Sequence, residues 1–175
     1  MKKIIFGLFL LFSFSAASQA QVFSQGDKVV NVGIGFGSYL GGSGYSIIIP
    51  PLAGSFEYGI VDGLINGNAS IGVGGYLGFA SEKTFDWHYN YFILGARGAF
   101  HYQFVDKLDT YAGLILGYNI TSSSGSGIGV NNNSLSGFAY STFVGARYYF
   151  TESIAAFAEI GYGISILQLG VAIKL

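Results

Sequence analysis

The sequence predicts a closed β-barrel that spans a membrane, and three observations lead to this fold class. The chain is apolar and sparsely charged, because 51% of its 175 residues are hydrophobic and 10% are charged, against roughly 25% in a soluble domain. No apolar run beyond the N-terminus reaches the roughly 18 residues of a membrane-spanning helix. Polar and apolar residues alternate in eight segments, and only helices and closed barrels satisfy their backbone hydrogen bonds in lipid.

The stretch YFILGARGAFHYQF, residues 91–104, shows the alternation. Its even-numbered residues are apolar, aromatic or glycine, whereas Arg97, His101 and Gln103 all belong to the odd-numbered set. Alternate side chains of a strand point to opposite faces. This segment is therefore expected to turn one wall toward lipid and the other toward a polar interior.

Eight segments of this kind, each near the roughly 9–11 residues of a tilted membrane strand, predict an antiparallel up-and-down barrel. They cover residues 28–38, 52–61, 67–80, 88–104, 108–120, 137–150, 153–163 and 165–175. The connections alternate in length, as in outer-membrane barrels. Residues 39–51 and 121–136 are predicted long outer loops, SEKTFDW (81–87) is an intermediate one, and the final outer connection near residue 164 is tight. An even number of strands puts both termini on the periplasmic side.

Residues 1–20 are predicted to be a cleavable signal peptide of the Sec type. Lys2 and Lys3 form its positive region, residues 4–14 its apolar region, and SQA (18–20) its cleavage site. The mature domain, residues 21–175, would keep six basic and nine acidic residues, a net charge of −3, which gives no electrostatic basis for binding nucleic acid. The chain has no cysteine, which excludes disulfides, a cysteine metal site and a lipid-modified cysteine.

Two stretches carry a resemblance to a known family. They are YNYFILGARGAFHYQFVDKLDTYAGLILGYN (89–119) and GARYYFTESIAAFAEIGYGISILQLGVAIKL (145–175), which both follow a strand–turn–strand pattern with Tyr or Phe at the strand ends. With the signal and the strand number, they make the chain similar to the small eight-stranded outer-membrane barrels of the OmpA/OmpX type, the porin family in its broad sense. The resemblance covers residues 21–175 and implies a location in the Gram-negative outer membrane.

The resemblance also implies partners. Outer-membrane lipid and lipopolysaccharide would surround the barrel, and the barrel-assembly machinery would recognise the C-terminal strand. The family usually ends in an aromatic residue, whereas this chain ends in Leu175, so a large apolar residue would have to serve in that signal. The barrel is expected to be a monomer, and no cofactor or metal is expected, because no His/Asp/Glu group has a metal-ligand spacing.

The polar wall is predicted to face the lumen, which in an eight-stranded barrel is only wide enough for side chains to fill. The predicted lumen network consists of Glu57, Arg97, His101, Arg147, Glu159 and Gln168. Asn31, Tyr76, Asp109 and Lys174 belong to the same wall, and glycines there make room for larger side chains. Arg147 and Glu159 are equidistant from residue 153, which suggests that they are cross-strand neighbours.

Three functions follow from this wall and the loops. A structural ion-pair network would plug the lumen, because buried charges need partners, and the protein would then act at the cell surface through its loops. Alternatively, exchange of ion pairs would open a narrow channel for small solutes. A remote alternative is an acyl-transfer enzyme at the rim, for which Ser81, Glu82, Asp86 and His88 are the candidates. We favour the plug and expect no enzyme.

The two long loops are the expected contact surface. Residues 39–51 combine glycines with the apolar run Ile47–Ile49 and two prolines, and an exposed apolar segment marks a partner site or a strand that continues above the membrane. Residues 121–136 are rich in Gly, Ser and Asn, as a flexible tether is. A soluble β-sandwich or lipocalin-like barrel is the rival fold, but the polar wall carries too few charges to coat a surface in water.

Overall fold

The structure is a computed structural model that describes residues 21–37, 46–85, 87–125 and 136–175. The predicted signal peptide, residues 1–20, lies outside the described residues, as do residues 38–45 and 126–135 of the two long loops. Within the described part of the chain, no helix is long and apolar enough to cross a membrane.

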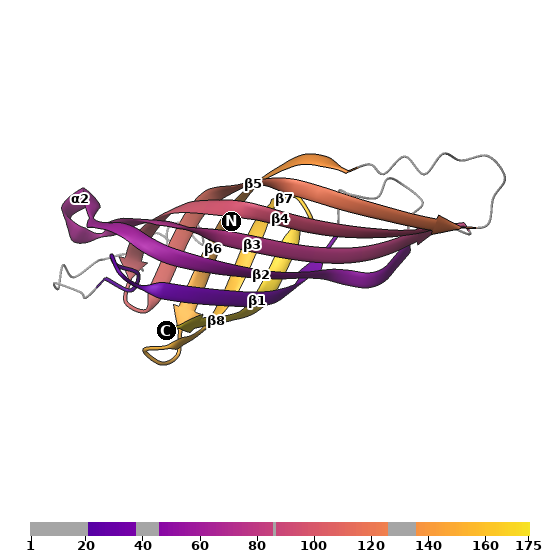
Figure 1. Ribbon diagram of the computed structural model, residues 1–175. Coiled ribbons are helices and arrows are strands. Elements are labelled where there is room, and N and C mark those ends of the chain that lie inside the picture. Colours follow the sequence, from indigo (N-terminus) through magenta and orange to yellow (C-terminus); the bar gives the residue numbers. More distant parts are fainter. Residues whose placement is uncertain (1–20, 38–45, 86, 126–135) are drawn as a thin grey trace, which may run out of the picture.

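Eight antiparallel strands close into one barrel in the order of the sequence (Figure 1). The strands are β1 (Lys28–Phe36), β2 (Ser46–Gly63), β3 (Ala69–Thr84), β4 (Trp87–Val105), β5 (Leu108–Gly125), β6 (Gly137–Tyr149), β7 (Ile154–Tyr162) and β8 (Leu167–Lys174). A short helical turn, α2 (Leu64–Gly67), joins β2 to β3. The predicted all-β, eight-stranded up-and-down barrel is confirmed.

The barrel closes where β1 pairs with β8, from Val29 opposite Lys174 to Phe36 opposite Leu167. Closure leaves no strand edge along this part of the wall, which is the condition for placing a sheet in lipid. The backbone N–H of Leu175 also donates to the carbonyl oxygen of Lys28. The start of β1 and the end of β8 therefore lie together, and we call this the terminal end; the opposite end is the loop end.

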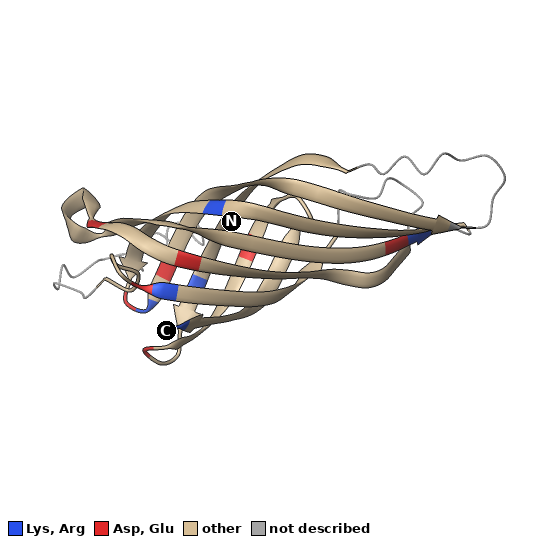
Figure 2. Ribbon diagram, in the orientation of Figure 1, with Lys and Arg blue, Asp and Glu red and all other residues tan. Residues whose placement is uncertain are grey.

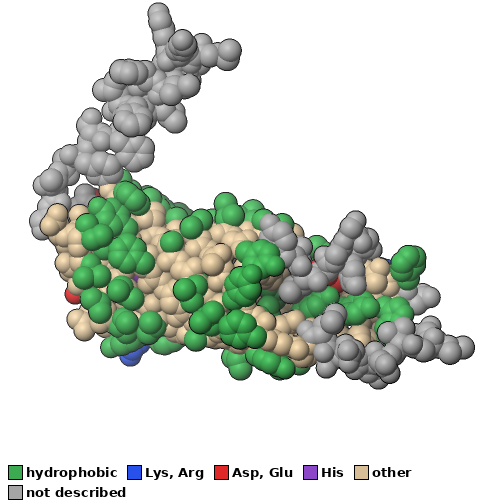
Figure 3. Space-filling view, turned by 90° about the horizontal axis from the view of Figure 1, so that it is seen from above, with side chains coloured by type: hydrophobic (Ala, Val, Ile, Leu, Met, Phe, Trp, Pro, Cys, Tyr) green, Lys and Arg blue, Asp and Glu red, His purple; other side chains and the backbone are tan. Residues whose placement is uncertain are grey.

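The outer wall is apolar around the barrel, as the alternation predicts. The most exposed aliphatic side chains at mid-strand include Val32, Leu94, Leu116, Val144 and Ile160. Figure 3 shows hydrophobic side chains spread along the face that it displays, with scarcely any charge among them. Exposed aromatic residues flank this band, with Phe36, Phe138, Tyr140 and Tyr162 toward the loop end and Tyr58, Phe104, Tyr148 and Phe150 toward the terminal end. Such aromatic girdles mark the two interfaces of a membrane.

The strands differ in length from the prediction at the loop end. Residues 46–51, predicted to be loop, belong to β2, and SEKTFDW is a tight hairpin because β3 continues to Thr84 and β4 begins at Trp87. Backbone pairing continues here although the side-chain alternation stops, with Ser46 opposite Lys83 and Trp87 opposite Gly125. As a result, the loop-end parts of β2 to β5 continue as a four-stranded sheet past the ends of β1 and β6–β8 (Figure 1). We call residues 46–51, 80–85, 87–91 and 121–125 the outer sheet.

Candidate functional site

The lumen contains a cluster of buried charged residues centred on Arg147, which β6 points into the barrel. The Arg147 side chain is completely buried. Its guanidinium donates to Glu57 on β2 at 2.6 Å, to Asp109 on β5 at 2.9 Å and to the side-chain oxygen of Asn31 on β1 at 3.1 Å. One arginine thus joins four strands across the lumen, and the fork shape of the guanidinium suits this arrangement.

A second arginine, Arg97 on β4, forms a bidentate pair with Glu159 on β7, with N–O distances of 2.7 and 3.2 Å. The Tyr111 hydroxyl donates to the same carboxylate at 2.9 Å. The guanidinium carbon of Arg97 lies 3.8 Å from the centroid of the Phe143 ring, within the range of a cation–π contact. Its Nε atom lies 3.5 Å from Glu57, so Arg97 stands between two carboxylates.

His101 lies between the two acidic partners of Arg147. Its Nδ1 atom lies 2.8 Å from Asp109, and its Nε2 atom contacts Glu57. Glu57 lies within ion-pair distance of all three basic side chains, Arg97, His101 and Arg147. Hydrogen bonds between groups of opposite charge are stronger than those between neutral groups. We call Glu57, Arg97, His101, Asp109, Arg147 and Glu159 the charged cluster.

Glycines on the inner wall provide the space for these side chains. A Cβ atom at Gly145 would lie 2.7 Å from both the Glu159 and Tyr111 side chains, and one at Gly72 would lie 2.4 Å from a Glu57 oxygen. These distances are well below van der Waals contact, so a larger residue at either position would require the lumen side chains to shift. The packing follows the sequence expectation that glycine on one strand makes room for a large polar residue from another.

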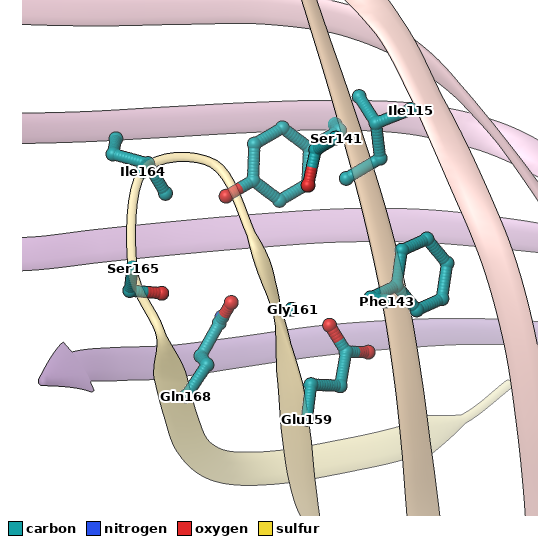
Figure 4. A pocket seen from close by; sticks show the side chains of 9 residues that line it. Ile115, Ser141, Phe143, Glu159, Gly161, Ile164, Ser165 and Gln168 are labelled. Atoms are coloured by element: carbon teal, nitrogen blue, oxygen red, sulfur yellow. The ribbon is translucent and has the colours of Figure 1, made fainter. Parts of the chain in front are cut away.

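Apolar and aromatic side chains close the lumen on the loop-end side of the charged cluster. The tight turn between β7 and β8 places Ile164 inside the barrel, where it is 4% exposed. Tyr76 and Phe143 are also buried there. A small pocket remains beside Glu159, and Figure 4 shows Glu159, Gln168, Ser141 and Ser165 around it.

The structure places all six residues of the predicted lumen network inside the barrel, where each is less than 10% exposed. Gln168, which carries no charge, lies opposite Glu159 in the sheet and lines the same small pocket. Figure 2 shows the charged positions along the strands lying mainly toward the terminal end, with an acidic–basic pair at the loop end of β3. Lys174 is near the terminal end and pairs with Asp27 at 2.6 Å.

The expected cross-strand register of Arg147 and Glu159 is wrong by two residues. Arg147 lies opposite Phe157, and Glu159 lies opposite Gly145. The shift arises because the connection from β6 to β7 is centred before residue 153, with Tyr149 opposite Ala155. The acidic partners of Arg147 therefore come from β2 and β5 rather than from β7.

Of the four candidates for a rim enzyme, the three that the structure describes do not share one environment. Ser81 and Glu82 are buried in β3, whereas His88 is exposed on β4 opposite Lys83. Asp86 lies outside the described residues. Among the residues that the structure describes, no group of three or more His, Asp or Glu side chains is arranged to hold a metal ion.

Sequence reasoning missed one residue that covers the charged cluster. Phe23, which precedes β1, is 1% exposed, and its ring stacks on His101 with 4.1 Å between ring centroids. Its only sequence signal is an apolar pair, Val22 and Phe23, in an otherwise polar segment. This is too short for a periodicity argument.

A closed eight-stranded barrel with an apolar outer band, two aromatic girdles and a polar interior defines a small transmembrane β-barrel of the outer-membrane type. Solved structures of such proteins share the fold. OprG of Pseudomonas aeruginosa is similar at 11% sequence identity over 90% of this chain and 99% of that chain, with a TM-score of 0.55. Ail, the attachment invasion locus protein of Yersinia pestis, is similar at 16% identity over 86% of this chain and 95% of that chain, with a TM-score of 0.52. No family model and no curated protein matches the sequence.

Proposed function

We propose that this chain is a monomeric outer-membrane protein whose lumen is closed and whose function lies at the outer cell surface. The charged cluster is the observation that carries this proposal. It fills the lumen with paired side chains that are all less than 10% exposed, and an eight-stranded barrel leaves little room for water beside them.

The proposal places the barrel in the Gram-negative outer membrane, with the terminal end in the periplasm and the outer sheet outside the cell. The two longest connections, between β1 and β2 and between β5 and β6, both lie at the loop end, which supports this orientation. Outer-membrane lipid and lipopolysaccharide would cover the apolar band. The assembly machinery would meet β8 and Leu175 during insertion.

The outer sheet supports a role in surface contacts. Ile47, Ile48 and Ile49 are all exposed beyond the aromatic girdle. Phe85, at the tip of the β3–β4 hairpin, is 97% exposed and has a φ of 50°. A bulky residue in the left-handed region costs on the order of 1–3 kcal/mol and persists where the surroundings or a function require it. An aromatic side chain held in this way suits apolar contact with another surface.

We expect the folded barrel to be silent in single-channel recordings in a planar bilayer. Folding would be verified by the change in gel mobility on boiling. A second candidate function, a narrow channel, has one observation in its favour, because Arg97 contacts carboxylates on both sides and movement between them would rearrange the cluster. Steady conductance that changes in Arg97→Ala would replace the closed-lumen proposal with this channel.

We expect Phe85→Ser to reduce the adhesion of cells that produce the protein to octyl-coated beads, because it removes the most exposed aromatic side chain of the outer sheet. Ile65→Ser is the matched control. Ile65 is 56% exposed and also has a positive φ, but it lies in the α2 turn at the terminal end. Equal effects of the two substitutions, or no effect of Phe85→Ser, would contradict a surface role for the hairpin tip.

A further inference from the structure

Residues 21–27, which we call the N-terminal segment, fold into the barrel at the terminal end before β1 begins. The backbone N–H of Val22 donates to the Gln103 side chain on β4 at 2.6 Å. The carbonyl oxygen of Val22 accepts a hydrogen bond from Lys174 on β8 at 3.0 Å. The segment is therefore attached to two well-separated strands and lies across the mouth of the barrel.

Phe23 is the part of the segment that reaches deepest. Its ring covers His101, and the guanidinium carbon of Arg147 lies 5.8 Å from its centroid. The carbonyl oxygen of Phe23 accepts a hydrogen bond from the Ser70 hydroxyl at 2.8 Å. Ser70 itself is completely buried. One aromatic side chain thus separates the charged cluster from the terminal mouth.

The rest of the segment forms a turn that is anchored to the rim. The Asp27 carboxylate accepts a hydrogen bond from the Ser24 N–H at 2.8 Å and pairs with Lys174 at 2.6 Å. Two backbone hydrogen bonds of 2.9 Å join the turn to β2, from Gly26 to the Gly59 carbonyl and from Gly59 to the Asp27 carbonyl. All of these attachments are noncovalent.

The inner wall is shaped to receive the segment. Gly59 on β2 and Gly72 on β3 lie directly opposite each other. A Cβ atom at Gly59 would lie 2.1 Å from the carbonyl oxygen of Ser24, and one at Gly72 would lie 3.0 Å from the Phe23 ring. Side chains at these two positions would occupy the space that the segment needs.

We infer that the N-terminal segment is a removable stopper that controls access from the periplasm to the charged cluster. The inference rests on the proposed function, since it takes the lumen to be closed and the terminal end to face the periplasm. The cluster keeps its own ion pairs when the segment leaves, because none of them involves residues 21–27. Release of the segment therefore opens a polar pocket, with His101 at its bottom, to periplasmic solutes, while the barrel still conducts no ions.

The test uses the absence of cysteine from the chain. Ser70→Cys places a single thiol beneath Phe23, and a charged methanethiosulfonate reagent serves as the probe on protein purified from the outer membrane. We expect the thiol to react slowly in this variant and about tenfold faster or more when Phe23→Ala or Gly59→Ala is added. Each of these substitutions locally exposes the residues that lie beneath the N-terminal segment. Phe23→Ala removes the ring, whereas Gly59→Ala keeps it and displaces the backbone of the segment.

Phe85→Ala combined with Ser70→Cys is the matched control, since it truncates an exposed phenylalanine at the other end of the barrel and should leave the rate unchanged. Gel mobility verifies folding in each case. Equal rates in all variants, or a rate in Ser70→Cys alone equal to that of the exposed Ser124→Cys, would overturn the stopper.

Conductance of the same proteins decides the proposed function separately. A conducting wild-type barrel contradicts the closed lumen, whereas a silent Phe23→Ala barrel with a fast thiol supports both.

Discussion

Arg147→Met is expected to lower the free energy of unfolding of the barrel by about 3–5 kcal/mol, the range for removing one partner of a buried charge network. The substitution leaves the Glu57 and Asp109 carboxylates buried without their main cation, and it also removes the donor to Asn31. Methionine fills much of the volume of arginine, so the decrease in the free energy of unfolding comes mainly from the loss of the positive charge. Urea unfolding in lipid vesicles, followed by gel mobility, measures the change.

Lys83→Met is the control for this prediction, because it removes an exposed positive charge at the loop end of β3, where the expected change is below about 1 kcal/mol. Adding Asp109→Asn to Arg147→Met should recover part of the stability, since it removes one of the two carboxylates that have lost Arg147 as a partner. Similar losses in Arg147→Met and Lys83→Met would show that the cluster contributes little to stability. The closed lumen would then need another explanation.

The side-chain alternation was sufficient to assign residues to the two walls. The parity of Glu57, Arg97 and His101 within their strands predicts that they face inward, and all three are buried. This works because the side-chain period of a strand is two, so one polar residue fixes the face of its neighbours. The number of strands followed from the same pattern.

The partners within the lumen could not be predicted in this way. Arg97 on β4 pairs with Glu159 on β7, and Arg147 on β6 pairs with Glu57 on β2. These pairs cross the barrel between strands that are not neighbours in the sheet. Which side chains meet depends on strand tilt and on the residues that fill the intervening space, and neither is encoded in a single strand.

The strand ends and the N-terminal segment lacked a periodic signal for different reasons. Ile47, Ile48 and Ile49 are apolar on both faces of β2, so alternation could not extend the strand to Ser46. Val22 and Phe23 are too few for any period. A signal for the N-terminal segment is present in β2 and β3. Gly59 and Gly72 leave unfilled space on the inner wall, and because a lumen of this width must be filled, this space indicates that another segment enters there.

Gly74→Ala is expected to prevent stable assembly of β2 against β3, at a cost of about 3 kcal/mol or more, the upper range for overpacking. A Cβ atom at Gly74 would lie 1.7 Å from the Phe56 carbonyl oxygen and 2.9 Å from the Glu57 Cα atom. Both are backbone atoms of the paired strand, so no change of rotamer relieves the contact. The two strands would have to separate next to the charged cluster, where Gly74 lies opposite both Glu57 and Arg97.

The adjacent residue provides the matched control for this prediction. Gly75 points to the lipid side, and a Cβ atom there meets no atom within 4 Å, so Gly75→Ala should change the stability by no more than about 0.5 kcal/mol. The two variants have the same composition and carry the same substitution at adjacent positions, so a difference in folded yield after transfer from urea into lipid vesicles isolates the inner wall. A Gly74→Ala barrel that folds as well as Gly75→Ala would mean that β2 and β3 can separate without loss. The glycines of the inner wall would then reflect something other than the space required by the charged cluster.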